Sequence, residues 1–176
     1  ELDYLTINVE RRKIETPTVA YNMDDDKIAY IQIAEFDEVT SGQFENYLSE
    51  AYQEGMKGLV IDLRDNPGGS LSTVVKIADQ ILPKGLVVYT EDRDGNRKEY
   101  SCDGSHEIQV PLVVLVNGNS ASASEILAGA VKDYGVGTIL GTTTFGKGIV
   151  QKIFSLSDGS ALKLTISHYY TPKGND

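Results

Sequence analysis

Three serines stand at alternate positions in the stretch GNSASASEI, which runs from Gly118 to Ile126. The stretch follows an apolar run and precedes residues with helical spacing, so one serine is expected at a turn between a strand and a helix. Ser122 and Glu125 fit the S-x-x-E capping box, in which both side chains satisfy free amides of the helix. Alternatively, Ser122 is a nucleophile, and the free N–H groups and positive dipole of the helix terminus stabilise the oxyanion formed by its attack on an acyl carbon.

A second glycine-rich turn, DLRDNPGG from Asp62 to Gly69, follows another short apolar run. By itself it is typical of a tight turn, in which proline sets one φ angle and glycine supplies a positive one. Two parallel strands that each end in such a turn would place both turns at the carboxyl edge of one sheet. Because glycine lets a ligand carbonyl approach the main chain closely, Gly68 and Ala123 are the candidate N–H donors to an oxyanion.

A serine nucleophile needs a base, and the chain contains two histidines. His106 lies in the polar loop DGSHE, where a solvated side chain is expected. His168 lies in the terminal stretch SHYY, where a packed or surface strand residue is expected. Neither histidine belongs to a recognisable Ser–His–Asp arrangement. The residue types therefore direct the search for a base to lysine.

Lys147 lies in the stretch TFGKGIVQ and is the candidate base. A lysine is a base only when it is neutral, so burial must lower its pKa from about 10.4 towards the working pH. Phe145, Ile149 and Val150 are expected to supply apolar surroundings, and Gln151 to hold the amine without adding a charge. The alternative is that FGKG forms a surface hairpin with a solvated lysine.

Length and composition are typical of one globular domain, since 40% of the 176 residues are apolar. The formal net charge of −10 argues against a nucleic-acid partner, because phosphate binding needs clustered lysines and arginines. The single cysteine, Cys102, excludes an internal disulfide and any metal site built from several cysteines. No apolar stretch approaches the length of a membrane span.

Hydrophobic periodicity predicts strands alternating with helices. Strands are expected at residues 4–9, 27–36, 58–64, 86–92, 110–117 and 161–170, and helices at residues 40–55, 71–82 and 122–134. The first of these helices is expected to begin at a cap formed by Thr40 or Ser41. This alternation predicts an α/β layer structure with at least some parallel strands.

Four segments, taken together and in order, resemble those of the carboxyl-terminal processing peptidases: DLRDNPGG, VLVNGNSASASEILAGAVKDY, GTTTFGKGIVQ and LTISHYYTPKG. These enzymes, also called tail-specific proteases, are serine endopeptidases of family S41 with a Ser–Lys dyad. The resemblance covers most of the chain from about Lys27 and implies a ClpP/crotonase-like layered sheet with flanking helices. It also implies a site composed of a nucleophile, a base, an orienting residue and two oxyanion donors, namely Ser122, Lys147, Gln151, Gly68 and Ala123.

The resemblance further implies a mechanism and a setting. The lysine takes the serine proton, an acyl-enzyme forms and is hydrolysed, and no metal, nucleotide or other cofactor is needed. Substrates are expected to be non-polar carboxyl-terminal tails of proteins, added as a strand along a sheet edge. The sequence leaves open whether the protein assembles as a homo-oligomer. Residues 1–26 are expected to be the end of a PDZ domain and its linker, and residues 27–176 a peptidase core truncated at its C-terminus. The expected location is extracytoplasmic, in a bacterial periplasm or cell envelope, with membrane anchoring through an N-terminal segment outside this chain.

Two other functions fit parts of the sequence. A crotonase-type acyl-CoA enzyme would use paired oxyanion amides on the same scaffold, but it would leave Lys147 without a role. A non-catalytic peptide-binding scaffold would keep the fold, and the capping box of Ser122 and Glu125 favours it.

Overall fold

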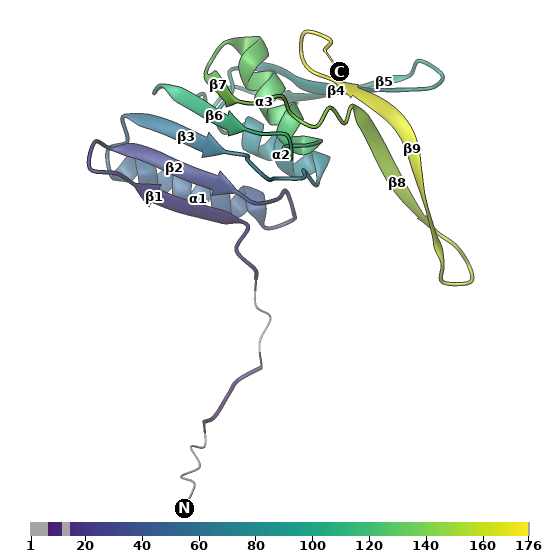
Figure 1. Cartoon of the computed structure of the whole chain (residues 1–176), viewed down its shortest axis with the longest axis horizontal. Coiled ribbons are helices and arrows are strands. Elements are labelled where there is room, and N and C mark those ends of the chain that lie inside the picture. Colours follow the sequence, from purple (N-terminus) through teal and green to yellow (C-terminus); the bar gives the residue numbers. More distant parts are fainter. Residues whose placement is uncertain (1–6, 12–14, 176) are drawn as a thin grey trace, which may run out of the picture.

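A computed structural model describes residues 7–11 and 15–175, which form two β-sheets and three helices (Figure 1). The main sheet has the strand order β1-β2-β3-β6-β7 and the second sheet the order β5-β4-β9-β8. The strands of the main sheet are β1 (Val19–Met23), β2 (Ile28–Ile33), β3 (Gly58–Asp62), β6 (Leu112–Val116) and β7 (Thr138–Gly141). Those of the second sheet are β4 (Gly85–Asp92), β5 (Arg97–Cys102), β8 (Ile149–Ser155) and β9 (Ala161–Tyr170). The helices are α1 (Thr40–Gln53), α2 (Leu71–Ala78) and α3 (Ala123–Tyr134). This architecture confirms the predicted α/β layers with flanking helices.

Strands β2, β3, β6 and β7 run parallel, and β1 adds an antiparallel edge. In the middle of the sheet, Ile61 pairs with Ile31 on one side and with Val114 on the other. These three side chains are fully buried, whereas Val60, on the opposite face of β3, is half-buried. The apolar run in β3 therefore reflects a sheet that is buried on its helical face and partly covered on the other.

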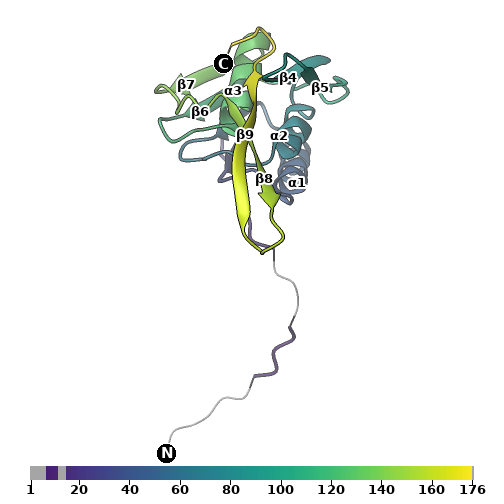
Figure 2. The ribbon, with the colours of Figure 1, turned by 90° about the vertical axis from the view of Figure 1, so that its right-hand side faces the viewer.

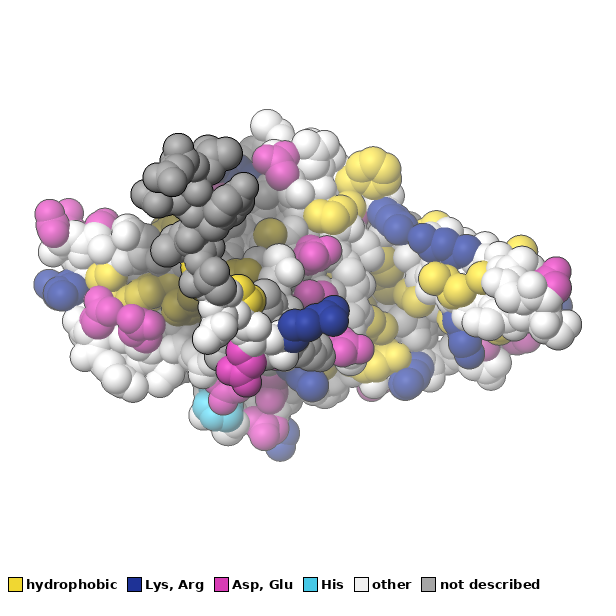
Figure 3. All heavy atoms as spheres, turned by 90° about the horizontal axis from the view of Figure 1, so that it is seen from below, with side chains coloured by type: hydrophobic (Ala, Val, Ile, Leu, Met, Phe, Trp, Pro, Cys, Tyr) yellow, Lys and Arg dark blue, Asp and Glu magenta, His cyan; other side chains and the backbone are white. Residues whose placement is uncertain are grey.

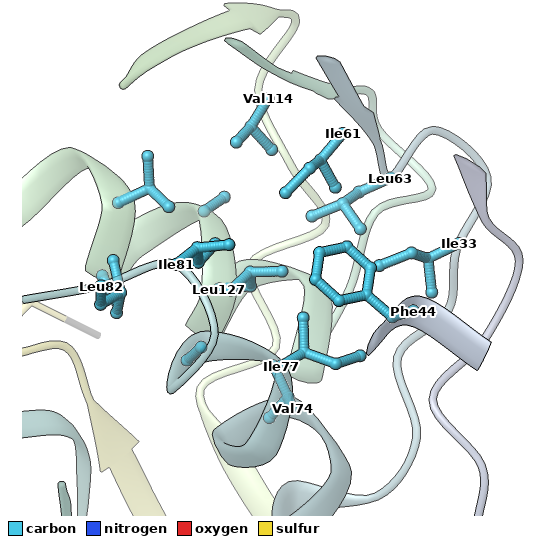
Figure 4. Close-up of a cluster of buried hydrophobic side chains, with 14 of the residues drawn as sticks. Ile33, Phe44, Ile61, Leu63, Val74, Ile77, Ile81, Leu82, Val114 and Leu127 are labelled. Carbon is cyan, nitrogen blue, oxygen red and sulfur yellow. The ribbon is translucent and has the colours of Figure 1, made fainter. Parts of the chain in front are cut away.

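The core lies between the main sheet and the helices, which Figure 2 shows on one side of that sheet. Its fully buried side chains come from the central strands, from the segments that follow them and from all three helices. Figure 4 labels ten of the buried core residues: Ile33, Phe44, Ile61, Leu63, Val74, Ile77, Ile81, Leu82, Val114 and Leu127. Because these side chains bury the β3–α2 and β6–α3 units against each other, the two turns have fixed relative positions.

Strands β8 and β9 form a long hairpin that projects from the body of the molecule (Figure 1). Only the last part of β9, from Ser167 to Tyr170, pairs with β4. Large apolar side chains are exposed along the hairpin, and hydrophobic and lysine side chains appear there in the right-hand part of Figure 3. These exposed residues are Ile153, Phe154, Leu156, Leu162, Leu164 and Ile166.

Three local predictions differ from the structure. Helix α1 begins at Thr40, but its N-cap is Val39, because the Thr40 hydroxyl accepts the Asp37 N–H while the Asp37 carboxylate accepts the amides of Val39 and Thr40. Helix α2 ends at Ala78, because the N–H of Ile81 donates to Ala78 in a tighter i→i−3 turn before a proline.

The third difference concerns the strand expected at residues 4–9. Its first part lies outside the described residues, and residues 7–9 are exposed and form no strand. Further along, β1 pairs with β2 within the main sheet, although it lies in the range expected to be the end of a PDZ domain and a linker. None of the described helices has both the length and the apolar character needed to span a bilayer.

Candidate active site

The turns after β3 and β6 lie side by side at the carboxyl edge of the main sheet. The two strands pair in parallel from Leu59 and Leu112 to Asp62 and Leu115. The N–H of Leu63 then donates to the carbonyl of Leu115 at 2.9 Å, where the first turn leaves the sheet. Each turn leads into a helix, α2 or α3, so the expected strand–turn–helix arrangement is present twice at one edge.

The first turn starts from an ion pair between the buried Asp62 and the exposed Arg64. Asp62 is 1% exposed and accepts hydrogen bonds from the Arg64 side chain at 2.6 Å and from the Tyr30 hydroxyl at 2.5 Å. Burial alone would raise the pKa of the Asp62 carboxyl, but the hydrogen bonds from Arg64 and Tyr30 outweigh it and the pKa is lowered. The same carboxylate accepts the Arg64 N–H at 2.9 Å, which starts the turn.

Asparagine and aspartate side chains join the two turns. One oxygen of Asp65 accepts the amide groups of Asn117 at 3.0 Å and Asn119 at 2.7 Å. In return, the Asn117 side-chain oxygen accepts the Asp65 N–H at 3.0 Å. Asp65 has a φ of +61°, a strained conformation that these hydrogen bonds help to hold.

Asn66 makes a second and fully buried connection. Its side-chain amide donates to the carbonyl of Ile33 at 2.8 Å, and its own carbonyl accepts the Ala121 N–H and the Ser124 hydroxyl, both at 3.0 Å. Its side-chain oxygen accepts the Gly68 N–H at 2.8 Å. One candidate oxyanion donor therefore already has a partner within the turn.

Ser122 precedes α3 with φ +55° and ψ −112°, a backbone conformation that non-glycine residues rarely adopt. Gly68 lies directly against it: a Cβ atom added to Gly68 would lie 2.7 Å from Ser122 Cβ and 2.9 Å from the nitrogen of Ala123. Within the described chain, the Ala123 N–H has no hydrogen-bond acceptor. The structure thus brings together the candidate nucleophile and both candidate oxyanion donors.

The segment that carries Lys147 reaches the same place. A cavity of about 410 Å³ is bordered by the two turns, by the start of β8 and by β9. Ser122, Ala123, Lys147 and Gln151 all line it, and neither histidine does. Its full lining is Pro67, Gly69, Ser70, Leu71, Ser122, Ala123, Ile126, Lys147, Ile149, Val150, Gln151, Lys163 and Tyr169.

The carboxylate of Glu125 connects the serine turn to the lysine segment. One of its oxygens accepts the Ser122 N–H at 2.8 Å and the Lys147 N–H at 3.0 Å, and the other accepts the Gly146 N–H at 2.6 Å. Burial alone would raise the pKa of Glu125, but these amide hydrogen bonds and one from the Thr144 side chain lower it overall. A charged carboxylate is therefore stable here.

Sequence reasoning recognised only the helix-capping part of this role. The capping box predicts the hydrogen bond from the Ser122 amide to Glu125. The other two donors to Glu125, the N–H groups of Gly146 and Lys147, belong to a segment about twenty residues away. No local sequence pattern predicts these hydrogen bonds. Glu125 is therefore a functional candidate that the sequence analysis missed.

The surroundings of Lys147 are more open than expected. Phe145 is 66% exposed, Gln151 is exposed, and Ile149 and Val150 are half-buried. The prediction of an apolar setting around Lys147 is therefore wrong for Phe145, because the projecting hairpin leaves this side of the segment uncovered. Across the described residues, no hydrogen bond joins Lys147 Nζ to Ser122 Oγ, and no carboxylate forms an ion pair with Lys147.

A group of side chains with metal-binding chemistry lies elsewhere. Asp79, Asp103 and His106 bring one ligand atom each within 4.8 Å of the others. None of the three lines the cavity at Ser122. The chemistry available at that cavity is that of hydroxyl, amine and carboxamide side chains beside main-chain N–H donors at a helix terminus.

Comparisons with known proteins identify the family of the chain and similar structures. Peptidase family S41 matches residues 27–176. A carboxyl-terminal-processing protease of Synechocystis is 39% identical over 94% of this chain, and a chloroplastic C-terminal processing peptidase of Tetradesmus obliquus is 42% identical over 85%. The chain spans 40% and 32% of the lengths of these two relatives. Among solved structures, a photosystem II D1 C-terminal processing protease aligns with a TM-score of 0.82 and 37% identity, covering 94% of this chain and 47% of that one.

Proposed function

The chain belongs to peptidase family S41, and from this we propose that it is the core of a serine endopeptidase that cleaves proteins near their carboxyl-terminal tails. One observation carries the proposal: Ser122, at a strained turn before α3, shares a cavity with Lys147 and lies against Gly68. The alternatives lack a comparable argument. A crotonase-type enzyme would leave the lysine unused, and a scaffold would not need the strained serine.

The proposed mechanism uses these groups in sequence. The amine of Lys147, which acts as a base only in its neutral form, accepts the proton of Ser122 as Oγ attacks the peptide carbonyl, and it then gives that proton to the departing amine. The N–H of Ala123 donates to the oxyanion. The N–H of Gly68, which donates to the Asn66 side chain in the structure, also donates to the oxyanion once it turns towards the substrate. Water then hydrolyses the acyl-enzyme. Gln151 orients the lysine in this scheme.

Substrate would bind as an additional strand beside β8. This strand ends the order of the second sheet, so its outer edge is unpaired in the described part of the chain. Its first residues, Ile149 to Gln151, line the cavity of Ser122, which would lead an extended peptide past the nucleophile. The exposed Ile153 and Phe154 further along β8 favour apolar residues in the tail.

The test uses the whole protein and a peptide with a non-polar carboxyl terminus. We expect cleavage by the native enzyme, stoichiometric labelling of Ser122 by a fluorophosphonate, and loss of cleavage in Ser122→Ala and Lys147→Ala. Lys57→Ala, an exposed lysine just before β3 that does not line the cavity, serves as the matched control and should remain active. Full cleavage by Lys147→Ala would refute the Ser–Lys assignment. Tail binding without turnover by the native protein would instead indicate a scaffold.

We also propose the setting implied by the family resemblance. The whole protein would act outside the cytoplasm. Within residues 1–26, the part before β1 would be the end of a PDZ domain, which presents substrate tails to the core, and its linker. The relatives' greater lengths leave room for such a domain. Deletion of the expected PDZ domain from the whole protein should raise KM for tail peptides. Protection of the protein from added protease in cells whose outer envelope has been removed, leaving the cytoplasmic membrane intact, would contradict the location.

A further inference from the structure

Tyr169 occupies a central position that neither the proposed mechanism nor the capping pattern uses. It lies near the end of β9, is 3% exposed and lines the cavity of Ser122. Its strand position pairs with Thr90 of β4, so the residue belongs to the root of the projecting hairpin. Its own N–H donates to the carbonyl of Gly148 at 3.1 Å, which joins its main chain to the segment of Lys147.

The phenol hydroxyl of Tyr169 faces three acceptors. It makes a short hydrogen bond to the carbonyl of Lys147, and it lies 3.3 Å from the carbonyl of Ser122 and 3.4 Å from a carboxylate oxygen of Glu125. A phenol has one proton to donate, so these three oxygens share it. Burial and, after it, the charge of Glu125 raise the pKa of Tyr169, so the hydroxyl keeps its proton at neutral pH.

Tyr169 and Glu125 act on complementary groups of the same two residues. Glu125 accepts the N–H groups of Ser122 and Lys147, and the Tyr169 hydroxyl faces the carbonyl groups of both. The main chains of the nucleophile and the base are therefore held from both sides, although their side chains share no hydrogen bond in the described structure.

We propose, as a deepening of the proposed function and resting on it, that Tyr169 is a positioning residue that aligns the main chains of Ser122 and Lys147 for proton transfer. It acts through its hydroxyl and does not itself exchange a proton with the substrate. Because it lies on β9, it also connects the nucleophile of the main sheet to the hairpin of the second sheet.

The experiment compares Tyr169→Phe with Tyr170→Phe in the whole enzyme. Both variants keep the ring and lose one hydroxyl, and the Tyr170 ring stacks on Tyr89 with centroids 5.0 Å apart, at a position next to Tyr169 on β9. For Tyr169→Phe we expect kcat to fall about tenfold or more, because small misplacements of reacting groups are costly. KM should stay within about twofold, and fluorophosphonate labelling of Ser122 should slow in parallel with kcat. Tyr170→Phe should match the native enzyme.

Amide hydrogen exchange gives a second readout that does not depend on activity. Tyr169→Phe should speed exchange at Gly146 and Lys147, whose amides donate to Glu125, and Tyr170→Phe should not. Native kcat together with native exchange in Tyr169→Phe would overturn the proposal, as would an equal loss in both variants. Absence of any Ser122-dependent cleavage by the native enzyme would refute the proposed function instead, and the exchange data would then decide whether Tyr169 holds the segment.

Discussion

The main-chain nitrogens of Ser122 and Lys147 donate to the same oxygen of Glu125, at 2.8 and 3.0 Å. The candidate nucleophile and the candidate base are thus coupled through the first turn of α3. The carboxylate accepts main-chain amides, and among the described residues it forms no ion pair with the lysine amine. A charged group can therefore hold the site together while leaving the lysine amine without a carboxylate partner.

Glu125→Gln should reduce kcat/KM about tenfold to a hundredfold. The amide would present N–H groups where the carboxylate accepts three main-chain N–H donors, so at least one donor would lose its partner. Peptide cleavage by the whole protein measures the effect. The control Glu107→Gln makes the same chemical change at an exposed position and should leave kcat/KM unchanged. Native activity in Glu125→Gln would show that the coupling is dispensable.

Acid should destabilise the protein partly through the same carboxylate. The pKa of Glu125 is lowered in the folded state, so its contribution to stability is complete above the unfolded value of about 4.3 and is lost as the pH falls through the folded value. Thermal melts of native protein and Glu125→Gln should therefore differ most near neutral pH and converge in acid. If the difference in melting temperature between the two proteins stays constant down to pH 3, the stabilisation comes from something other than this ionisation.

Gly68→Ala should abolish most activity and destabilise the fold. The new Cβ would lie 2.6 Å from the carbonyl of Ala121 and 2.7 Å from Ser122 Cβ, at a φ of +101°. Overpacking of this kind costs about 1–3 kcal/mol. The clash would also displace the Gly68 N–H from the oxyanion, and an oxyanion site without one of its donors loses about a hundredfold or more in kcat. Gly95→Ala is the matched control, because Gly95 also has a positive φ, +82°, but no atom within 4 Å of the added Cβ. It should lose a little stability and keep full activity.

Asn66→Ala should lower the free energy of unfolding by about 2 kcal/mol, because it leaves the buried carbonyl of Ile33 without its donor. The exposed Asn96→Ala should change stability by less than about 0.5 kcal/mol. Denaturant titration measures both. Equal effects in the two variants would mean that the carbonyl of Ile33 finds another partner.

The β3 and β6 turns could be predicted because local rules determine them. Apolar runs followed by glycine-rich turns and helical spacing indicate parallel strand–turn–helix units, and parallel pairing then brings the turns together. Gly68 and Ser122 meet for this reason. The identity of Lys147 as a candidate followed from its residue type and the family resemblance, not from a local rule.

The second sheet was harder to predict because its contacts are long-range. The openness around Lys147 depends on how the β8–β9 hairpin leaves the body, and periodicity within either strand carries no information on that angle. For the same reason, the sequence did not indicate the roles of Glu125 and Tyr169, because their hydrogen-bond partners at Lys147 lie on another segment. The N-cap of α1 was missed for a smaller reason, since Asp37 competes for the role expected of Thr40.

The attachment of the hairpin has a consequence for how catalysis would begin. In the described part of the chain, the hairpin pairs with β4 through Ser167 to Tyr170 at the end of β9, which includes the tyrosine that faces both reacting positions. A peptide laid along the outer edge of β8 would stiffen the whole arm down to this joint. Substrate binding along β8 and the placement of the Lys147 segment would then be mechanically linked.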